Sequence, residues 1–179
     1  ALTPQFLAGK DVTKMPQFGI DSVTVPGAVD GWSKLLTRFG KLTLHDDLQS
    51  AIRYASEGFP VPEWDAAYWA EAAGFFAKNP ETAKLYLIDG HAPALGEVFR
   101  NPDLAHSLTL IANNGRDAYY KGPIAQQILA LSKKEGGAMT ASDLADYSAD
   151  WVDPLSTTYH GWTVYGLPPN GQGSSALEI

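Results

Sequence analysis

Apolar residues recur at helical spacing along most of the chain, which predicts a mainly helical protein. The expected helices cover residues 28–39, 44–57, 64–79, 102–114 and 123–135, with single turns at 117–121 and after Thr140. Their apolar stripes are expected to face a core: Val29, Trp32, Leu35, Leu36, Phe39, Leu44, Leu48, Ile52, Ala55, Trp64, Tyr68, Ala72, Phe75, Phe76, Leu104, Leu108, Ile111, Ala112, Ile124, Ile128 and Leu131. For the aromatic stripe of 64–76, core packing is favoured over a ligand cage.

Capping signals mark where several of these helices begin. Thr43 with Asp46, and Thr140 with Asp143, have the spacing of a capping box. At Asn101-Pro102-Asp103 a capping side chain, a first-turn proline and an acid at the positive end of the helix dipole coincide. The helix after Asn101 is therefore the most strongly specified.

Extended structure is expected in two places. Residues 20–25 alternate apolar and polar side chains and predict a short strand. Near the C-terminus, the extended residues 150–159 and a strand over 162–167 would form a hairpin around the turn His160-Gly161. The fold class expected for this chain is therefore mainly α with a small β-hairpin (α+β).

The remaining segments carry weaker patterns. Residues 2–8 resemble the tail of a helix, 85–88 form a short apolar run, and 91–99 are expected to be irregular. After the loop Asn170–Gly173, Ser174 is expected to cap a last helix whose inner face carries Leu177.

The chain ends soon after that helix starts, so we expect residues 1–179 to be a segment of a larger protein, incomplete at both ends. A helix of little more than one turn has little to cover its apolar face and no closing cap. Such a segment exposes apolar surface that a larger protein would cover. Self-association of the isolated chain is therefore expected.

Composition excludes several classes of function. A net charge of −7 argues against nucleic-acid binding through a basic face, because that mode needs clustered Lys and Arg. The chain has no cysteine, so it can form no disulfide, thiolate metal site or cysteine nucleophile. No apolar run is long enough to cross a membrane, and neither nucleic acid nor membrane is expected as a partner.

Residue types and spacing alone indicate no catalytic, cofactor-binding or metal site. None of the four histidines shares a metal-ligand spacing with another, and Asp103 with His106 is expected to be a surface pair. Gly171–Ala176 fits the dinucleotide pattern G-x-G-x-x-A, but a hairpin and Pro168-Pro169 precede it, which disfavours a cofactor loop. Ser174 and Ser175 lack the G-x-S-x-G context of a serine nucleophile.

A series of short motifs nevertheless covers nearly the whole chain. The stretches are Ser22–Trp32, Arg38–Gly40, Ala51–Val61, Gly96–Glu97, Asn101–Ala105, Ile111–Gly115, Tyr120–Gly122, Ile124–Ala125, Gly136–Gly137, Thr140, Asp143–Tyr147 and Tyr165–Gly173. In this order they resemble the large-subunit region of the gamma-glutamyltransferase (glutathione hydrolase) family.

The resemblance implies a parent enzyme with an αββα N-terminal nucleophile hydrolase fold. Such an enzyme is made as a precursor that cuts itself into a large and a small subunit. The small subunit's N-terminal threonine attacks a γ-glutamyl amide with its own α-amine as the base, and the acyl group passes to water, an amino acid or a peptide. No metal or organic cofactor is implied, and the partner of this segment would be the small subunit of the same precursor.

None of the implied catalytic groups maps onto this chain. The nucleophile would lie beyond Ile179, and the arginine that grips the substrate carboxylate would precede Ala1. The arginines present lie in other motifs and do not inherit that role: Arg38, Arg53, Arg100 and Arg116.

Asn170–Gly173 stands where the family often has Ser-Ser-Gly-Gly. An acylase or amidohydrolase acting on a non-glutamyl amide therefore stays open. So does a helical binding module with no enzymatic parent, for which the isolated segment would be the functional unit.

Overall fold

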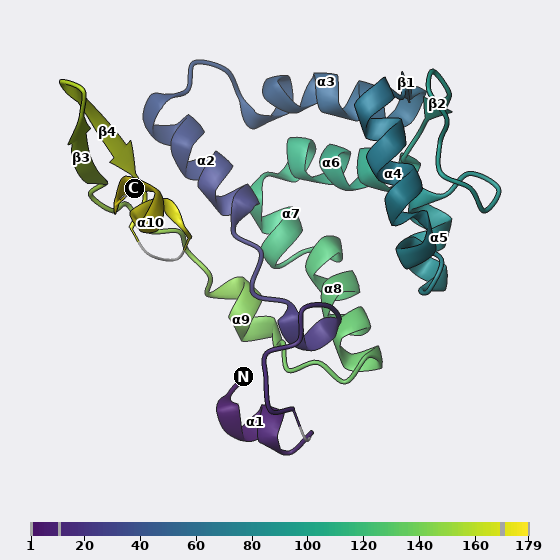
Figure 1. The fold of residues 1–179 in the computed structure, drawn as a ribbon, viewed down its shortest axis with the longest axis horizontal. Coiled ribbons are helices and arrows are strands. Elements are labelled where there is room, and N and C mark those ends of the chain that lie inside the picture. The colour runs from purple at the N-terminus through teal and green to yellow at the C-terminus, as the bar shows by residue number, and fades with distance from the viewer. Residues whose placement is uncertain (1, 11, 169–170, 179) are drawn as a thin grey trace. The chain divides into compact units, whose positions relative to one another are not determined.

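The computed structural model describes residues 2–10, 12–168 and 171–178, which form two compact units. The helical unit comprises Ala1–Tyr147, and the C-terminal unit comprises Ser148–Ile179 (Figure 1). No helix among the described residues is long and apolar enough to span a membrane.

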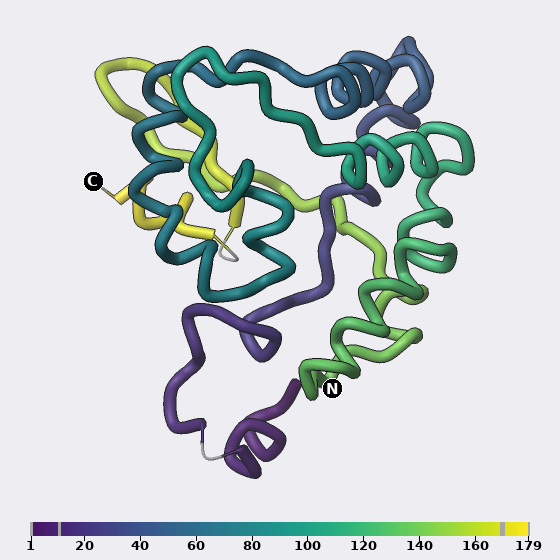
Figure 2. Tube along the Cα trace, turned by 90° about the vertical axis from the view of Figure 1, so that its right-hand side faces the viewer, coloured from purple at the N-terminus to yellow at the C-terminus, as the bar shows by residue number. Residues whose placement is uncertain are grey.

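The helical unit contains most of the secondary structure. Its helices are α1 (Pro4–Ala8), a 3-10 turn (Ile20–Ser22), α2 (Ala28–Phe39), α3 (Leu44–Glu57), α4 (Glu63–Phe76), α5 (Pro80–Tyr86), α6 (Pro102–Asn114), α7 (Arg116–Tyr120), α8 (Pro123–Lys134) and α9 (Ala141–Ala145). A short antiparallel pair joins β1 (Phe59–Pro60) to β2 (Val98–Phe99). Figure 2 shows α6, α7 and α8 following one another along the green part of the trace.

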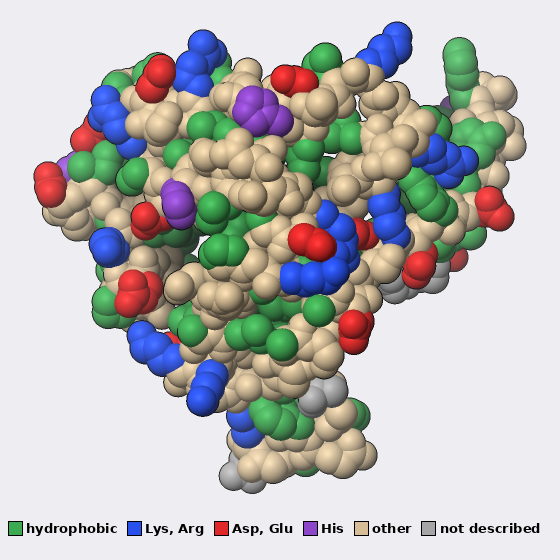
Figure 3. All heavy atoms as spheres, turned by 180° about the vertical axis from the view of Figure 1, so that it is seen from behind, with side chains coloured by type: hydrophobic (Ala, Val, Ile, Leu, Met, Phe, Trp, Pro, Cys, Tyr) green, Lys and Arg blue, Asp and Glu red, His purple; other side chains and the backbone are tan. Residues whose placement is uncertain are grey.

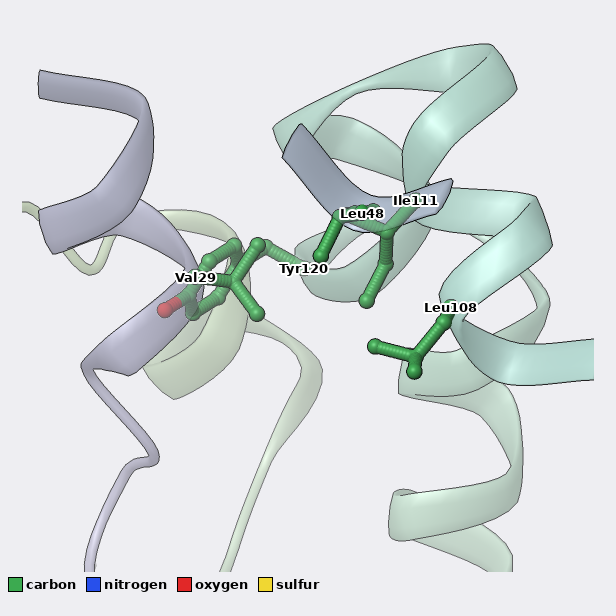
Figure 4. Close-up of a cluster of buried hydrophobic side chains, with 5 residues drawn as sticks. All are labelled: Val29, Leu48, Leu108, Ile111 and Tyr120. Atoms are coloured by element: carbon green, nitrogen blue, oxygen red, sulfur yellow. The ribbon is translucent and has the colours of Figure 1, made fainter. Parts of the chain in front are cut away.

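The core lies where α3 and α6 run side by side and α2 and α7 meet them (Figure 1). Its buried members are Val29, Leu48, Leu108, Ile111 and Tyr120. Figure 4 shows Val29 against the Tyr120 ring, while Leu48, Leu108 and Ile111 meet between α3 and α6. Burying each aliphatic side chain stabilises the fold by about 1.5 to 3 kcal/mol before entropy is counted.

The predicted caps at Thr43, Asn101 and Thr140 are confirmed. Thr43 Oγ1 accepts the Asp46 N–H at 3.1 Å and the Asp46 carboxylate accepts the Thr43 N–H at 3.1 Å, which completes a capping box. The Thr43 hydroxyl also donates to the Asp46 carboxylate at 2.6 Å, and the hydrogen bonds that this carboxylate accepts from the Thr43 side chain and backbone lower the pKa of Asp46. Thr140 and Asp143 form a second box, and Asn101 accepts the Leu104 N–H at 2.9 Å.

The structure corrects three local predictions. Residues 20–25 are not a strand, because no strand among the described residues pairs with them; instead a 3-10 turn forms, with the Ser22 hydroxyl donating to the Gly19 carbonyl at 2.7 Å. Helix α1 has its own N-cap at Thr3, so it begins there and is not the tail of a longer helix. Helix α5 was not predicted at all.

Several predicted core faces are exposed in this chain. Helix α4 has no buried residue, and Trp64 and Tyr68 are 73% and 63% exposed. On α2 only Val29 of the predicted stripe is buried, while Trp32, Leu35 and Phe39 are exposed. Further exposed members of the predicted faces are Phe75, Leu104 and Leu131. Figure 3 shows such hydrophobic side chains at the surface, between interspersed acidic and basic groups.

The C-terminal unit confirms the predicted hairpin. Strands β3 (Leu155–Tyr159) and β4 (Trp162–Gly166) pair antiparallel, with Tyr159 opposite Trp162. Both turn residues have positive φ, 47° at His160 and 82° at Gly161, as a tight type I′ turn requires. Helix α10 (Gly173–Glu178) begins one residue before the predicted cap Ser174, and its Leu177 packs against Gly166. Asn170 of the predicted loop lies outside the described residues.

The hairpin presents an apolar face that the described chain leaves open. Alternation and register place Leu155, Tyr159, Trp162 and Val164 on one face, and all are exposed. We expect the isolated chain to form dimers or larger species in size-exclusion chromatography with light scattering. Trp162→Glu should shift the distribution toward monomer, whereas Thr158→Glu, which adds the same charge to the other face, should shift it less. A monomer at high concentration would contradict this expectation.

Candidate functional site

The most buried charged group of the helical unit is Asp30, in the first turn of α2. Its side chain is 2% exposed. Arg116, the first residue of α7, donates from Nε to Asp30 Oδ1, and Lys34 Nζ lies 3.6 Å from Asp30 Oδ2. Two cations therefore face this carboxylate, one of them through a charge-assisted hydrogen bond.

Tyr120 joins this ion pair to the core. Its hydroxyl donates to the Pro26 carbonyl at 2.7 Å and accepts the Asp30 N–H at 3.2 Å, so it fixes the start of α2. The Arg116 guanidinium lies 4.4 Å from the centre of the Tyr120 ring, within cation–π range. The aromatic ring thus covers the ion pair on one side.

Tyr147, the last residue of the helical unit, completes the cluster. Its ring stacks on Tyr120 with centroids 5.7 Å apart and planes 14° apart. Arg116 Nη2 donates to its carbonyl. A Cβ on Gly27 would collide with the Tyr147 hydroxyl, so a larger residue at this position would displace the Tyr147 ring.

The electrostatics keep this cluster charged. Burial alone would lower the pKa of Arg116, but the hydrogen bond and the negative charge of Asp30 raise it above its usual value. Burial also raises the pKa of the Tyr120 hydroxyl. The hydroxyl therefore stays protonated and continues to donate its hydrogen bond to the Pro26 carbonyl.

This arrangement stabilises the fold and offers no reactive group to a substrate. Asp30 is closed off from solvent, and its oxygens face Arg116 and Lys34. A general base must reach the proton that it removes, and a carboxylate this enclosed cannot. We therefore assign the cluster to positioning α2, α7 and the end of the helical unit.

The histidines and Asp103, which the sequence analysis considered as candidate ligands, lie outside the Asp30 cluster. Asp103 and His106 share α6 but form no hydrogen bond or ion pair with each other in the described part of the chain. His45 lies beside Asp46 at 3.8 Å in an exposed pair, and His91 contacts the Ala92 carbonyl. Within residues 2–10, 12–168 and 171–178, no three His, Asp or Glu side chains are grouped to hold a metal ion.

The glycine-rich stretch lies in the C-terminal unit. Gly171 precedes α10, and Gly173 opens it, packed near the Leu167 backbone. Ser174 and Ser175 lie in the first turn of this six-residue helix, after an antiparallel hairpin. The parallel strand–helix–strand context of a dinucleotide site is not formed by the described residues.

Sequence reasoning did not identify the Asp30–Arg116 pair. Asp30 lies inside the motif Ser22–Trp32 and Arg116 directly follows Ile111–Gly115, but 86 residues separate the two. The available signal was an acid next to the buried Val29 on an amphipathic helix. Such a residue needs a buried partner, but local spacing cannot name it.

Comparisons with a family model, a curated sequence and solved structures relate this chain to the same group of proteins, and each covers nearly the whole chain. The gamma-glutamyltranspeptidase family model matches residues 1–179. The glutathione hydrolase-like YwrD proenzyme of Bacillus subtilis (strain 168) is 40% identical, over 95% of this chain and 34% of its own length.

Two solved structures share the fold. Cephalosporin acylase from Bacillus halodurans superposes with a TM-score of 0.88 at 38% identity, over 99% of this chain and 34% of the acylase chain. Helicobacter pylori gamma-glutamyltranspeptidase superposes with a TM-score of 0.85 at 29% identity, over 93% of this chain and 48% of that chain.

The chain spans about a third of the length of the YwrD proenzyme that it matches. The family match and the structural similarity both extend across the helical unit and the C-terminal unit. Family membership is therefore a property of the whole chain and does not rest on one motif. The chain belongs to the gamma-glutamyltranspeptidase family.

Proposed function

We propose that residues 1–179 are the helical segment of the large subunit of a γ-glutamyl-transferring enzyme, incomplete at both ends. The complete protein would be an autoprocessed N-terminal nucleophile hydrolase with an αββα core. The small subunit of the same precursor supplies the N-terminal threonine that attacks the γ-glutamyl amide of a glutathione-type substrate. The acyl-enzyme then passes the γ-glutamyl group to water or to an amino acid.

The observation that carries this proposal is the family match over residues 1–179, together with 40% identity to a proenzyme. The best-enclosed polar cluster supports it in a second way. Asp30 and Arg116 form a buried ion pair with each other, so neither is available to react with a substrate. This agrees with a structural segment whose reactive group is supplied by another part of the polypeptide.

An acylase is the second candidate. It is favoured by the 38% identity to a cephalosporin acylase and by Asn170–Gly173, which replaces the family's frequent Ser-Ser-Gly-Gly. In this alternative the fold and the threonine mechanism stay the same, and the acyl group lacks the α-amino group of glutamate.

A chromogenic γ-glutamyl anilide tests the proposal. We expect no turnover by the 179-residue chain and steady release of the aniline by the complete, processed protein, because the nucleophile and its amine base lie outside residues 1–179. Turnover by the chain alone would show that it contains the nucleophile. Absence of turnover by the complete protein would exclude the γ-glutamyl reaction.

Glutaryl anilide separates the two candidates, since it differs from the γ-glutamyl substrate only by the missing α-amino group. A γ-glutamyl transferase should have a much higher kcat/KM for the γ-glutamyl anilide, because a site built to bind the ammonium group leaves polar groups unpaired without it. A preference for the glutaryl compound would establish the acylase.

A further inference from the structure

Helices α4 and α5 and strand β1 lie close together in the helical unit (Figure 1), and residues from all three line an aromatic pocket. Its volume is about 460 Å³. Its walls are formed mainly by ring side chains with one acid among them: Phe59, Asp65, Tyr68, Trp69, Phe76 and Tyr86.

Three rings of this pocket, those of Trp69, Phe76 and Tyr86, are held in place by their contacts. Trp69 Nε1 donates to the Tyr86 carbonyl at 2.8 Å, which ties α4 to the end of α5. The Trp69 ring meets Phe99 edge-on with centroids 4.6 Å apart, and Phe76 stacks on Tyr86 at 5.2 Å. Rings fixed in this way need little ordering when a ligand binds.

The charged side chain that lines the pocket is an acid, Asp65. Asp65 forms no ion pair with any described residue, so its charge is available to a ligand. No Lys or Arg lines the pocket. The faces of aromatic rings are themselves regions of negative potential, so rings and carboxylate attract the same kind of ligand.

We propose that this pocket binds a small organic cation that carries a methylated ammonium group. Such a group is weakly hydrated, has an apolar surface that fits against rings, and keeps a full positive charge for Asp65 and the ring faces. An anion would be repelled by Asp65. A neutral apolar ligand would gain contact with the rings but nothing from the carboxylate.

The test compares choline with 3,3-dimethyl-1-butanol, which has the same shape without the charge. Each is titrated into the 179-residue chain and into the complete protein, and tryptophan indole N–H signals are followed by NMR. Sodium chloride keeps the ionic strength constant. We expect saturable chemical-shift changes with choline. The dissociation constant of the neutral alcohol should be at least about five times that of choline.

Matched variants locate the site. Asp65→Asn and Tyr68→Leu should each weaken choline binding about two- to fivefold. Glu71→Gln removes an acid from the same helix outside the pocket, and Phe75→Leu removes an exposed aromatic that does not line it, so both should bind as the original chain does.

Three outcomes would overturn the proposal. Equal affinity for the neutral alcohol would mean a merely apolar surface. Absence of choline binding by the complete protein would mean that other polypeptide covers the pocket. Choline binding that survives both Asp65→Asn and Tyr68→Leu would place the ligand elsewhere.

Discussion

Replacing Arg116 by alanine is expected to lower the free energy of unfolding by about 3 kcal/mol or more, because it leaves a buried carboxylate without its hydrogen-bonded partner. Asp30 is 2% exposed, and the remaining cation, Lys34, lies 3.6 Å away and is partly in solvent. The variant also loses the donor to the Tyr147 carbonyl and the cation over the Tyr120 ring. Urea unfolding followed by circular dichroism measures the change.

Two controls isolate the buried pair. Asp117 also contacts Arg116, at 3.2 Å, but its side chain is 61% exposed. Asp117→Asn should therefore change stability by less than about 1 kcal/mol. The double variant Asp30→Asn with Arg116→Ala should lower the free energy of unfolding by clearly less than the sum of the two single changes. Each single change leaves one buried charge without its partner, and the double change removes both charges. Strict additivity would show that the two side chains are not coupled.

Gly58→Ala is expected to destabilise the chain by about 3 kcal/mol, from two independent causes. Gly58 has φ 91° and ψ 173°, a region open almost only to glycine. A Cβ there would lie 2.6 Å from Val98 Cγ1 and 2.8 Å from the Phe99 carbonyl oxygen. The start of β1 would have to move away from β2. Thermal unfolding of the variant measures the effect as a lowered Tm.

Gly74→Ala is the matched control, because it adds the same methyl group inside α4 with nothing within 4 Å. Helix propensity predicts that this change stabilises the helix by up to about 1 kcal/mol. Opposite signs for the two substitutions are therefore expected. Equal effects would mean that the tight contact of Gly58 with β2 does not exist in solution.

The pattern Asn-Pro-acid marks the start of two helices in this chain. Asn101-Pro102-Asp103 correctly placed the start of α6. Asn79-Pro80-Glu81 carries the same signal, and the Asn79 side chain accepts the Thr82 N–H at 3.0 Å to start α5. The helix predicted over 64–79 ends just before this proline, and no helix was predicted after it. The missed helix was therefore predictable from the residues.

Burial could not be predicted in the same way. The stripe of α4 is apolar at the predicted positions, but periodicity shows only which face is apolar, not what covers it. Trp64 and Tyr68 remain exposed in this chain. The strand predicted over 20–25 was wrong for a related reason, because alternation produces a strand only where a neighbouring strand supplies hydrogen bonds.

The polar cluster was beyond sequence patterns for a geometric reason. Asp30 and Arg116 are brought together by the packing of α2 against α7, so their pairing depends on the tertiary fold. The sequence shows that one residue is an acid and the other an arginine, but it does not show that they pair. Family resemblance located the motifs around them without assigning either residue a role.

The bond from Arg116 to the Tyr147 carbonyl lies at the boundary between the two units. It anchors the last residue of the helical unit to the first residue of α7, so the segment that follows α9 is held within this unit as far as Tyr147. A substitution that removes the donor would release this segment, and local opening would then start at α9 and no longer after Tyr147.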